Sequence, residues 1–258
     1  MIKPVVIKTE DELQKMAHSG RLLASVFQML DTLPLMGMST MAVNDVVDRF
    51  ITQDLKSRPA SKGQYGYAFA LNSSVNEVIC HGVPSDAKIL KDGDIVNFDI
   101  TLENDGFIAD SSKTYLIGNV AVGARRLVRV TYEAMWKGIR QVRPGARLGD
   151  IGHAIESHAK AHGYAVVRDY CGHGIGREMH EDPQVMHFGR QGTGEVLSEG
   201  MTFTIEPMIN QGTAKSLTLD DEWTVVTRDG KLSAQWEHTI AVTKHGFDVL
   251  TLRHDERV

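Results

Sequence analysis

The sequence has little cysteine: two residues in 258, Cys80 and Cys171. Two thiols can form at most one disulfide, so a disulfide-rich scaffold is excluded. Their spacing also lacks the paired pattern of a thiolate zinc site. We expect both cysteines to be reduced and to pack in the interior.

Long apolar runs are also absent. No stretch approaches the length that spans a bilayer, and the N-terminus lacks a cationic flank followed by an apolar segment. We therefore expect neither a signal peptide nor membrane contact, and the cytoplasm is the expected location. Positive charge is not in excess, because 28 basic residues face 33 acidic ones. This balance argues against nucleic-acid binding.

What is present indicates one mixed domain. Thr9 and Glu12 form a capping box before a first helix, and Ser39 or Thr40 can cap a second. Further helical patterns and alternating strand patterns follow; the helices are expected at 121–142 and 148–162, and the strands at 94–102, 201–209 and 233–242. No proline-rich linker divides the chain. We predict a single α+β domain over residues 1–258.

An internal echo suggests two related halves. The segments "LKDGDIVNFD" (90–99) and "LSEGMTFTIE" (197–206) align without gaps, and each ends in a carboxylate, Asp99 or Glu206. Two strands can look alike by chance, and that alternative stays open. A duplicated half-domain would bring both carboxylates to one cleft.

Each half offers a second carboxylate on its next strand: Asp110 in "FIADSSKTY" and Glu237 in "QWEHTIAV". An unpaired buried charge costs several kcal/mol, so these groups need a cation. The stretch "CGHGIGREMHEDP" (171–183) adds His173 and His180, whose spacing of seven differs from the i, i+4 pair of helical zinc proteases. Four carboxylates and an imidazole suit two divalent metal ions, Co, Mn, Fe or Zn.

Together with "CHGVP" (80–84) and "GHGIG" (172–176), these residues resemble the complete metal-site pattern of the methionine aminopeptidases of the pita-bread fold, in their type I bacterial form. The resemblance implies two pseudo-symmetric halves, with antiparallel sheet and flanking helices around a central metal cleft. It also implies a set of metal ligands: Asp99, Asp110, His173, Glu206 and Glu237. Asp110 and Glu237 would bridge the two ions.

The implied reaction is hydrolysis, by a water bridging the two metals, that removes methionine from peptides or nascent proteins with a small second residue. Glu206 would accept and return the proton. His180 and His81 would contact the substrate. Transient ribosome contact and a monomeric state are further expectations, and the remaining histidines, His158 and His162 among them, are expected to be satisfied core or surface residues.

The substrate pocket departs from the family pattern. Tyr67 and Trp223 match, whereas the other wall positions carry residues in place of the usual cysteine, tyrosine and phenylalanine: Ser61, Gln64, Asn72 and Met179. Such a wall predicts lower efficiency or looser selectivity for methionine, as in a paralogue of a housekeeping enzyme.

Two other functions share this pattern. An X-Pro peptidase of the same fold would carry the same metal residues, but usually has a large N-terminal domain that this sequence lacks. A non-catalytic pita-bread binding module typically has lost ligands, whereas all five are present here.

Overall fold

The central feature of the computed structural model, which describes residues 4–257, is a curled nine-stranded sheet. Its strands run in the order β1-β4-β5-β14-β9-β7-β8, with β2 paired to β4 and β15 paired to β14. These strands have the following bounds: β1 Arg58–Pro59, β2 Leu71–Val75, β4 Ile95–Asn104, β5 Phe107–Leu116, β7 Gly172–Gly174, β8 Glu181–Val185, β9 Thr202–Ile205, β14 Glu237–Thr243 and β15 Gly246–Val249. The strands of each pair are antiparallel.

Two three-stranded sheets complete the β structure, in the orders β13-β10-β6 and β11-β12-β3. Their strands are β3 Val78–Cys80, β6 Ala165–Val166, β10 Met208–Asn210, β11 Ser216–Thr218, β12 Val225–Thr227 and β13 Ser233–Gln235. The outermost residues of the predicted 1–258 domain lie outside the described part of the chain.

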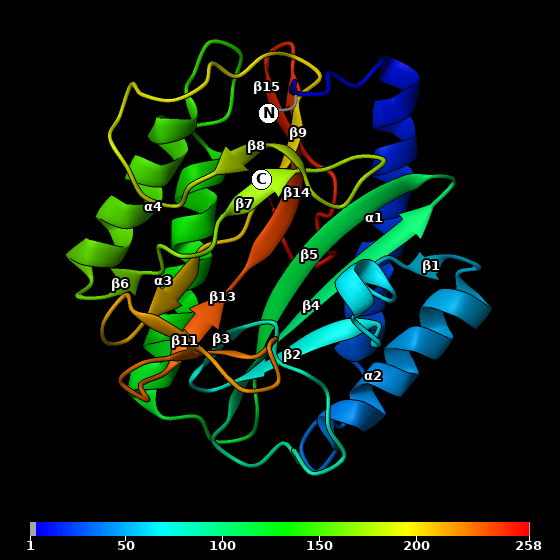
Figure 1. The fold of residues 1–258 in the computed structure, drawn as a ribbon, viewed down its shortest axis with the longest axis vertical. Helices are drawn as coiled ribbons and strands as arrows, with labels where there is room; N and C mark the ends of the chain where they lie inside the picture. Colours follow the sequence, from blue (N-terminus) through cyan, green and yellow to red (C-terminus); the bar gives the residue numbers. More distant parts are fainter. Residues whose placement is uncertain (1–3, 258) are drawn as a thin grey trace.

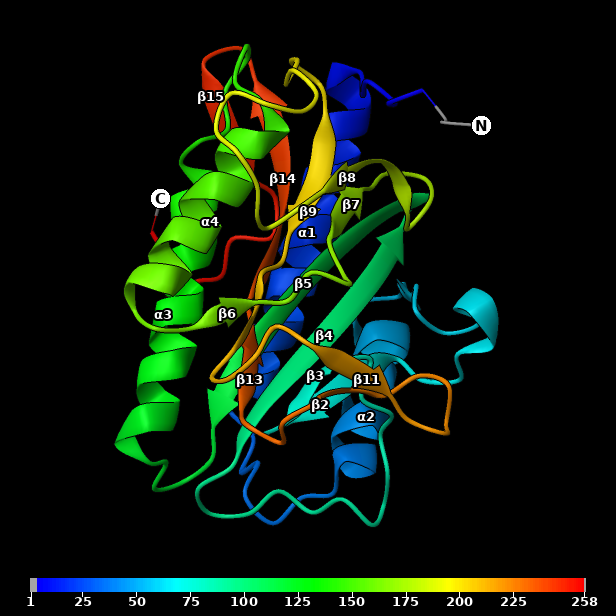
Figure 2. The ribbon, with the colours of Figure 1, turned by 60° about the vertical axis from the view of Figure 1, so that its left-hand side comes forward.

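Helices flank the large sheet in two pairs. They are α1 Glu10–Leu30, α2 Thr40–Arg49, α3 Val122–Ile139 and α4 Leu148–Ala161. Helices α1 and α2 lie with the N-terminal half, and α3 and α4 with the C-terminal half (Figure 1). Turned by 60°, the ribbon shows α3 and α4 together on one side and the long strands β4 and β5 crossing the middle (Figure 2).

The helix starts follow from their caps. The Thr9 capping box is present, and Ser39, rather than Thr40, caps α2 through a 3.0 Å bond from the Ala42 amide. Helix α2 continues beyond Arg49 as a π-helical turn, Phe50–Asp54. Two helices end earlier than predicted: α3 ends at Ile139 instead of 142, and α4 ends at Ala161 instead of 162. No helix in residues 4–257 combines the length and apolar character that a membrane span requires.

The two predicted later strands are each broken. The prediction of one strand over 201–209 is wrong, because β9 ends before Glu206-Pro207 and β10 begins after it. The predicted strand 233–242 is likewise divided at Trp236 into β13 and β14. Strands β10 and β13 pair with each other in a three-stranded sheet, whereas β9 and β14 pair with each other in the large sheet. Proline lacks an N–H for a continuous ladder, so the chain changes sheet at Pro207.

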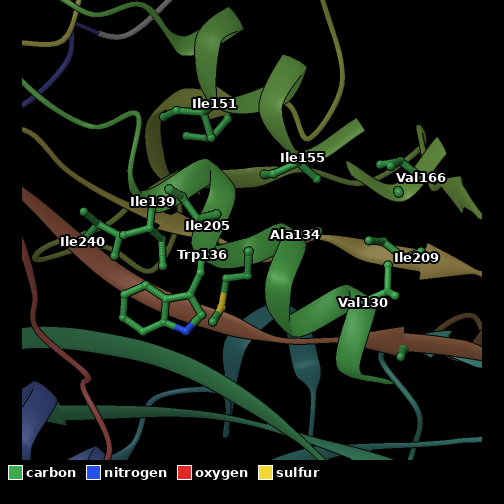
Figure 3. Close-up of a cluster of buried hydrophobic side chains, with 14 of the residues drawn as sticks. Val130, Ala134, Trp136, Ile139, Ile151, Ile155, Val166, Ile205, Ile209 and Ile240 are labelled. Carbon is green, nitrogen blue, oxygen red and sulfur yellow. The ribbon is translucent and has the colours of Figure 1, made fainter. Parts of the chain in front are cut away.

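The two similar segments, 90–99 and 197–206, lie at corresponding places in the large sheet. Strand β4, which contains Asp99, pairs with β5; strand β9, which precedes Glu206, pairs with β14; and β5 and β14 pair with each other at the centre. Each half has its own apolar core against its helix pair. Figure 3 shows the C-terminal core, where Ile139 of α3 and Ile151 and Ile155 of α4 gather with Ile205 and Ile240 of the sheet. The predicted α+β pita-bread architecture is confirmed.

Candidate active site

A cleft of about 600 Å³ opens on the inner face of the large sheet. The structure brings every residue predicted for the site to its lining: Tyr67, His81, Asp99, Asp110, His173, Met179, His180, Glu206, Trp223 and Glu237. Its remaining walls include the three other departing positions, Ser61, Gln64 and Asn72.

The strand register explains why three carboxylates meet. Ser112 on β5 lies opposite Asp99 of β4 on one side and Glu237 of β14 on the other. Asp110 is two residues before Ser112, so its side chain projects from the same face of the sheet. Glu206 follows β9 directly, at the point where the chain leaves the large sheet. The fold thus directs carboxylates from both halves into one cleft.

His173, in the middle of β7, completes the cluster. Its Nε2 atom lies 3.6 Å from Oε1 of Glu206 and 3.9 Å from Oδ2 of Asp110. Ligand atoms of Asp110, His173 and Glu237 all lie within 4.8 Å of one another. Nδ1 of His173 is 3.0 Å from the Gly174 carbonyl, to which it donates, so the lone pair of Nε2 faces the carboxylates.

The carboxylates repel one another in a buried setting. Burial raises the pKa of Asp99 from 3.8 to about 6 and that of Glu206 from 4.5 to about 8. Burial, followed by the charges of neighbouring carboxylates, holds the pKa values of Asp110 and Glu237 well above their ordinary range. Burial lowers the pKa of His173 to about 3, so its imidazole is neutral.

A divalent cation fits this donor set. None of the described residues that line the cleft is a lysine or an arginine. Lys8 pairs with the lining residue Glu181, and Arg253 offsets only part of the rise in the pKa of Glu237. Oδ1 of Asp110 is buried and makes no hydrogen bond in the structure. Carboxylate oxygens and one imidazole nitrogen are ligands for Mn, Fe, Co or Zn.

Neighbouring hydroxyl and amide groups fix the carboxylates. Thr204 donates to Oε1 of Glu206 at 2.7 Å, and Gln235 donates to Oε2 at 3.4 Å. The Thr239 hydroxyl accepts a 3.0 Å bond from the Asp110 amide. Asn72 lies opposite Asp99 in the β2–β4 ladder, and its side chain offsets part of the rise in the pKa of Asp99. The sequence predicted Asn72 only as a residue of the pocket wall. Its position opposite Asp99 depends on the pairing of β2 with β4, which the sequence does not specify.

His180 stands at the mouth of the cleft beside His173, with ring centroids 4.4 Å apart. Tyr65 also stacks on His180, with ring centroids 5.8 Å apart, and the Tyr65 hydroxyl is 3.3 Å from Nδ1 of His180. Tyr65 is a site residue that was not predicted from the sequence. The flanking glycines, Gly63 and Gly66, were the signal in the sequence for a tight turn here. In the structure Tyr65 lies in that turn with φ of 50°.

The pocket wall is part aromatic and part polar. Tyr67 and Trp223 pack with ring centroids 4.9 Å apart, and the Tyr67 hydroxyl donates a hydrogen bond to the Leu71 carbonyl at 2.9 Å. Met179 is buried and belongs to an apolar cluster that continues behind the cleft. The Ser61 hydroxyl is bonded to the Phe69 carbonyl at 3.0 Å.

Both cysteines also line the cleft, as free thiols. Burial raises the pKa of Cys171 to about 11 and that of Cys80 well above its ordinary value. A nucleophile or metal ligand would be a thiolate, so these groups suit packing, as expected.

Comparison with known proteins agrees with this geometry. The sequence profile of metallopeptidase family M24 matches residues 14–244. The methionine aminopeptidase of Escherichia coli strain K12 is 46% identical over 254 residues, which cover 98% of this chain and 96% of that protein. The crystal structure of methionine aminopeptidase from Rickettsia prowazekii superposes with a TM-score of 0.94 at 48% identity, covering 96% of this chain and 100% of that one.

More distant structures share the fold alone. A prolidase from Thermococcus sibiricus matches with a TM-score of 0.77 at 20% identity, and the match covers 98% of this chain but 62% of the prolidase. The choice between methionine aminopeptidases and prolidases follows from the identity of 46% over nearly the full length to a methionine aminopeptidase, together with the profile match. The chain belongs to metallopeptidase family M24, in its methionine aminopeptidase group.

Proposed function

We propose that this chain removes the N-terminal methionine from peptides and nascent proteins whose second residue is small, using two divalent metal ions. One observation carries the proposal: the five candidate ligand residues, from both halves of the fold, meet in a single acidic cleft whose described lining has no lysine or arginine. The 46–49% identical relatives are named methionine aminopeptidases, which supports the same specificity.

We assign the ions to Asp99, Asp110, His173, Glu206 and Glu237, with Asp110 and Glu237 shared. Ions held there would supply Lewis acidity and an acidified water. Asp110 suits a shared position because Oδ2 faces His173 while Oδ1 makes no hydrogen bond. Co, Mn, Fe and Zn all match these donors.

Glu206 is assigned the proton transfer. Its carboxylate is held at both oxygens, by Thr204 and Gln235, so it presents a fixed acceptor to the attacking water. It takes the proton of the water and returns it to the departing amine. His81 and His180 are assigned to the peptide carbonyl; burial lowers the pKa of both imidazoles, so each is neutral near pH 7 and can donate one N–H.

The acidic cleft also selects the free amino terminus. The neutral α-amine of a substrate would offer its lone pair to a metal ion held by these carboxylates, whereas an internal peptide bond offers no such group. The methionine side chain would lie between Tyr67, Met179 and Trp223. Ser61, Gln64 and Asn72 make the rest of this wall polar, so we expect looser selectivity than an aromatic wall would give.

A monomeric state, transient ribosome contact and a cytoplasmic location remain predictions of the sequence. The preference for a small second residue and the absence of nucleic-acid specificity are likewise predictions.

The decisive experiment is a comparison of kcat/KM for matched peptides that begin Met-Ala, Leu-Ala, Met-Ile and Ala-Pro, each with Mn, Fe, Co and Zn. We expect Met-Ala to be the best substrate with at least one metal. Equal values for Met-Ala and Leu-Ala refute methionine specificity. A preference for Ala-Pro would instead favour an X-Pro peptidase.

A further inference from the structure

A second group of potential metal ligands lies between α3 and α4. Glu133 of α3 and His158 and His162 at the end of α4 each offer one ligand atom, and these atoms lie within 4.8 Å of one another. None of the three lines the catalytic cleft. They therefore form a cluster that the proposed peptidase reaction does not use.

The two histidines have the spacing of a helical metal site. Residues i and i+4 of a helix lie on one face, which is the arrangement by which paired histidines reach one zinc ion. The rings of His158 and His162 have centroids 4.4 Å apart. Nε2 of His158 is 3.0 Å from Oε2 of Glu133. Nitrogen and oxygen ligands around one tetrahedral ion are separated by similar distances, because each lies about 2 Å from the metal.

Hydrogen bonds orient the side chains of His162 and Glu133. Nδ1 of His162 donates to the His158 carbonyl at 2.9 Å, which leaves the lone pair on Nε2. Oε1 of Glu133 accepts from Arg129 at 2.5 Å, which holds the carboxylate and leaves Oε2 toward His158. Such partners fix the tautomer and direction of ligands in known metal sites.

The helix pair that carries the cluster is rigidly packed. Gly138 allows a close approach, since a Cβ atom there would lie 2.7 Å from Cδ1 of Ile155. Figure 3 shows Ile151 and Ile155 of α4 beside Ile139 of α3 in the buried core. Arg126 of α3 also donates to the His162 carbonyl at 3.2 Å. Glu133 and His158 therefore stand on packed helices, and His162 is the residue that directly follows α4.

We propose that Glu133, His158 and His162 form a peripheral site for a divalent transition metal of the Zn²⁺, Ni²⁺ or Cu²⁺ class. Two imidazoles favour these ions over Mg²⁺ and Ca²⁺, and a single carboxylate near Arg129 is a poor site for hard cations. The side chains of Glu133 and His158 are 33% and 15% exposed, so the site is open to solvent and leaves room for water ligands.

An ion bound there joins α3 to α4. Because it binds the folded helix pair and not the separated helices, it stabilises the fold by mass action. The chemistry is independent of the aminopeptidase activity.

The test is Zn²⁺ stoichiometry, measured by equilibrium dialysis and metal analysis on the full chain. Wild type is expected to bind one more equivalent than His158→Gln or His162→Gln. The control is His153→Gln, which changes another α4 histidine outside the cluster and should keep the wild-type stoichiometry. Saturating Zn²⁺ should raise the Tm of wild type by about 2–4 °C more than that of either variant. Equal stoichiometry in wild type and both cluster variants overturns the site.

A second measurement needs no variant of the cluster. The imidazole NMR resonances of wild type are followed during Zn²⁺ titration after the catalytic cleft has been loaded. The resonances of His158 and His162 are expected to shift together while those of His153 stay in place. Saturation without any change at His158 and His162 contradicts the proposal.

Discussion

Replacement of Glu206 by glutamine is expected to stabilise the metal-free protein at alkaline pH, although it damages the enzyme. In the metal-free fold, burial raises the pKa of Glu206 from 4.5 to about 8. The folded state therefore holds a proton that the unfolded chain has already released. Stability from this group is fully present below pH 4.5 and is lost as the pH rises to about 8.

The size of the effect follows from the same values. Each pKa unit corresponds to about 1.4 kcal/mol, so the range from 4.5 to about 8 sets an upper limit of about 5 kcal/mol. The other buried carboxylates share protons with Glu206, and a changed hydrogen bond costs about 1 kcal/mol. We expect Glu206→Gln to gain about 2–4 kcal/mol at pH 9 and to be close to wild type at pH 4.5.

The structure can accommodate the amide. The new side-chain oxygen can accept from Thr204, as Oε1 does now at 2.7 Å. The new NH₂ group would face Gln235, whose Oε1 is buried without a hydrogen-bond partner. Rotation of the Gln235 amide turns that oxygen into the acceptor.

The assay is urea unfolding of chelator-treated protein at pH 4.5, 7 and 9, with the exposed Glu199→Gln as control. We expect the stability difference between Glu206→Gln and wild type to grow with pH, and the control to follow wild type throughout. With saturating divalent metal the order should reverse, because an amide is the weaker ligand. A metal-free variant no more stable than wild type at pH 9 refutes the electrostatic reasoning.

Four further outcomes are expected. Chelation should abolish peptidase activity and divalent metal should restore it; full activity in metal-free protein would contradict metal dependence. Asp110→Asn should lower bound metal per chain as well as turnover, since its carboxylate faces His173, and normal metal content would count against a shared ligand. Tyr65→Phe should reduce kcat about five-fold, the value of roughly 1 kcal/mol for one hydrogen bond to His180, with little change in KM. Gln64→Tyr should raise the ratio of kcat/KM for Met-Ala over Leu-Ala by about 5-fold or more, as expected for an added aromatic contact of about 1 kcal/mol or more, and an unchanged ratio would remove Gln64 from the pocket wall.

Local signals in the sequence predicted local structure well. The Thr9 capping box and the Ser39 cap specify helix starts by hydrogen bonds within four residues. The Asp105-Gly106 turn joins β4 to β5, because the left-handed conformation of both residues reverses the chain. Strand length was less predictable. Pro207 and Trp236 lie where the chain passes between sheets, and no local pattern says with which partner a strand will pair.

The sequence by itself identified the candidate metal ligands of the cleft and predicted that they come from two similar halves. Carboxylates at the ends of matching segments, two spaced histidines and the flanking motifs are all readable in one dimension. Tertiary structure decided what those groups face. It set the 3.6 Å between His173 and Glu206, the burial that raises the pKa of Glu206, and the contact of Tyr65 with His180. It also joined Glu133 to His158 across two helices, 25 residues apart. Distance and desolvation depend on long-range packing, whereas residue chemistry and local turns do not.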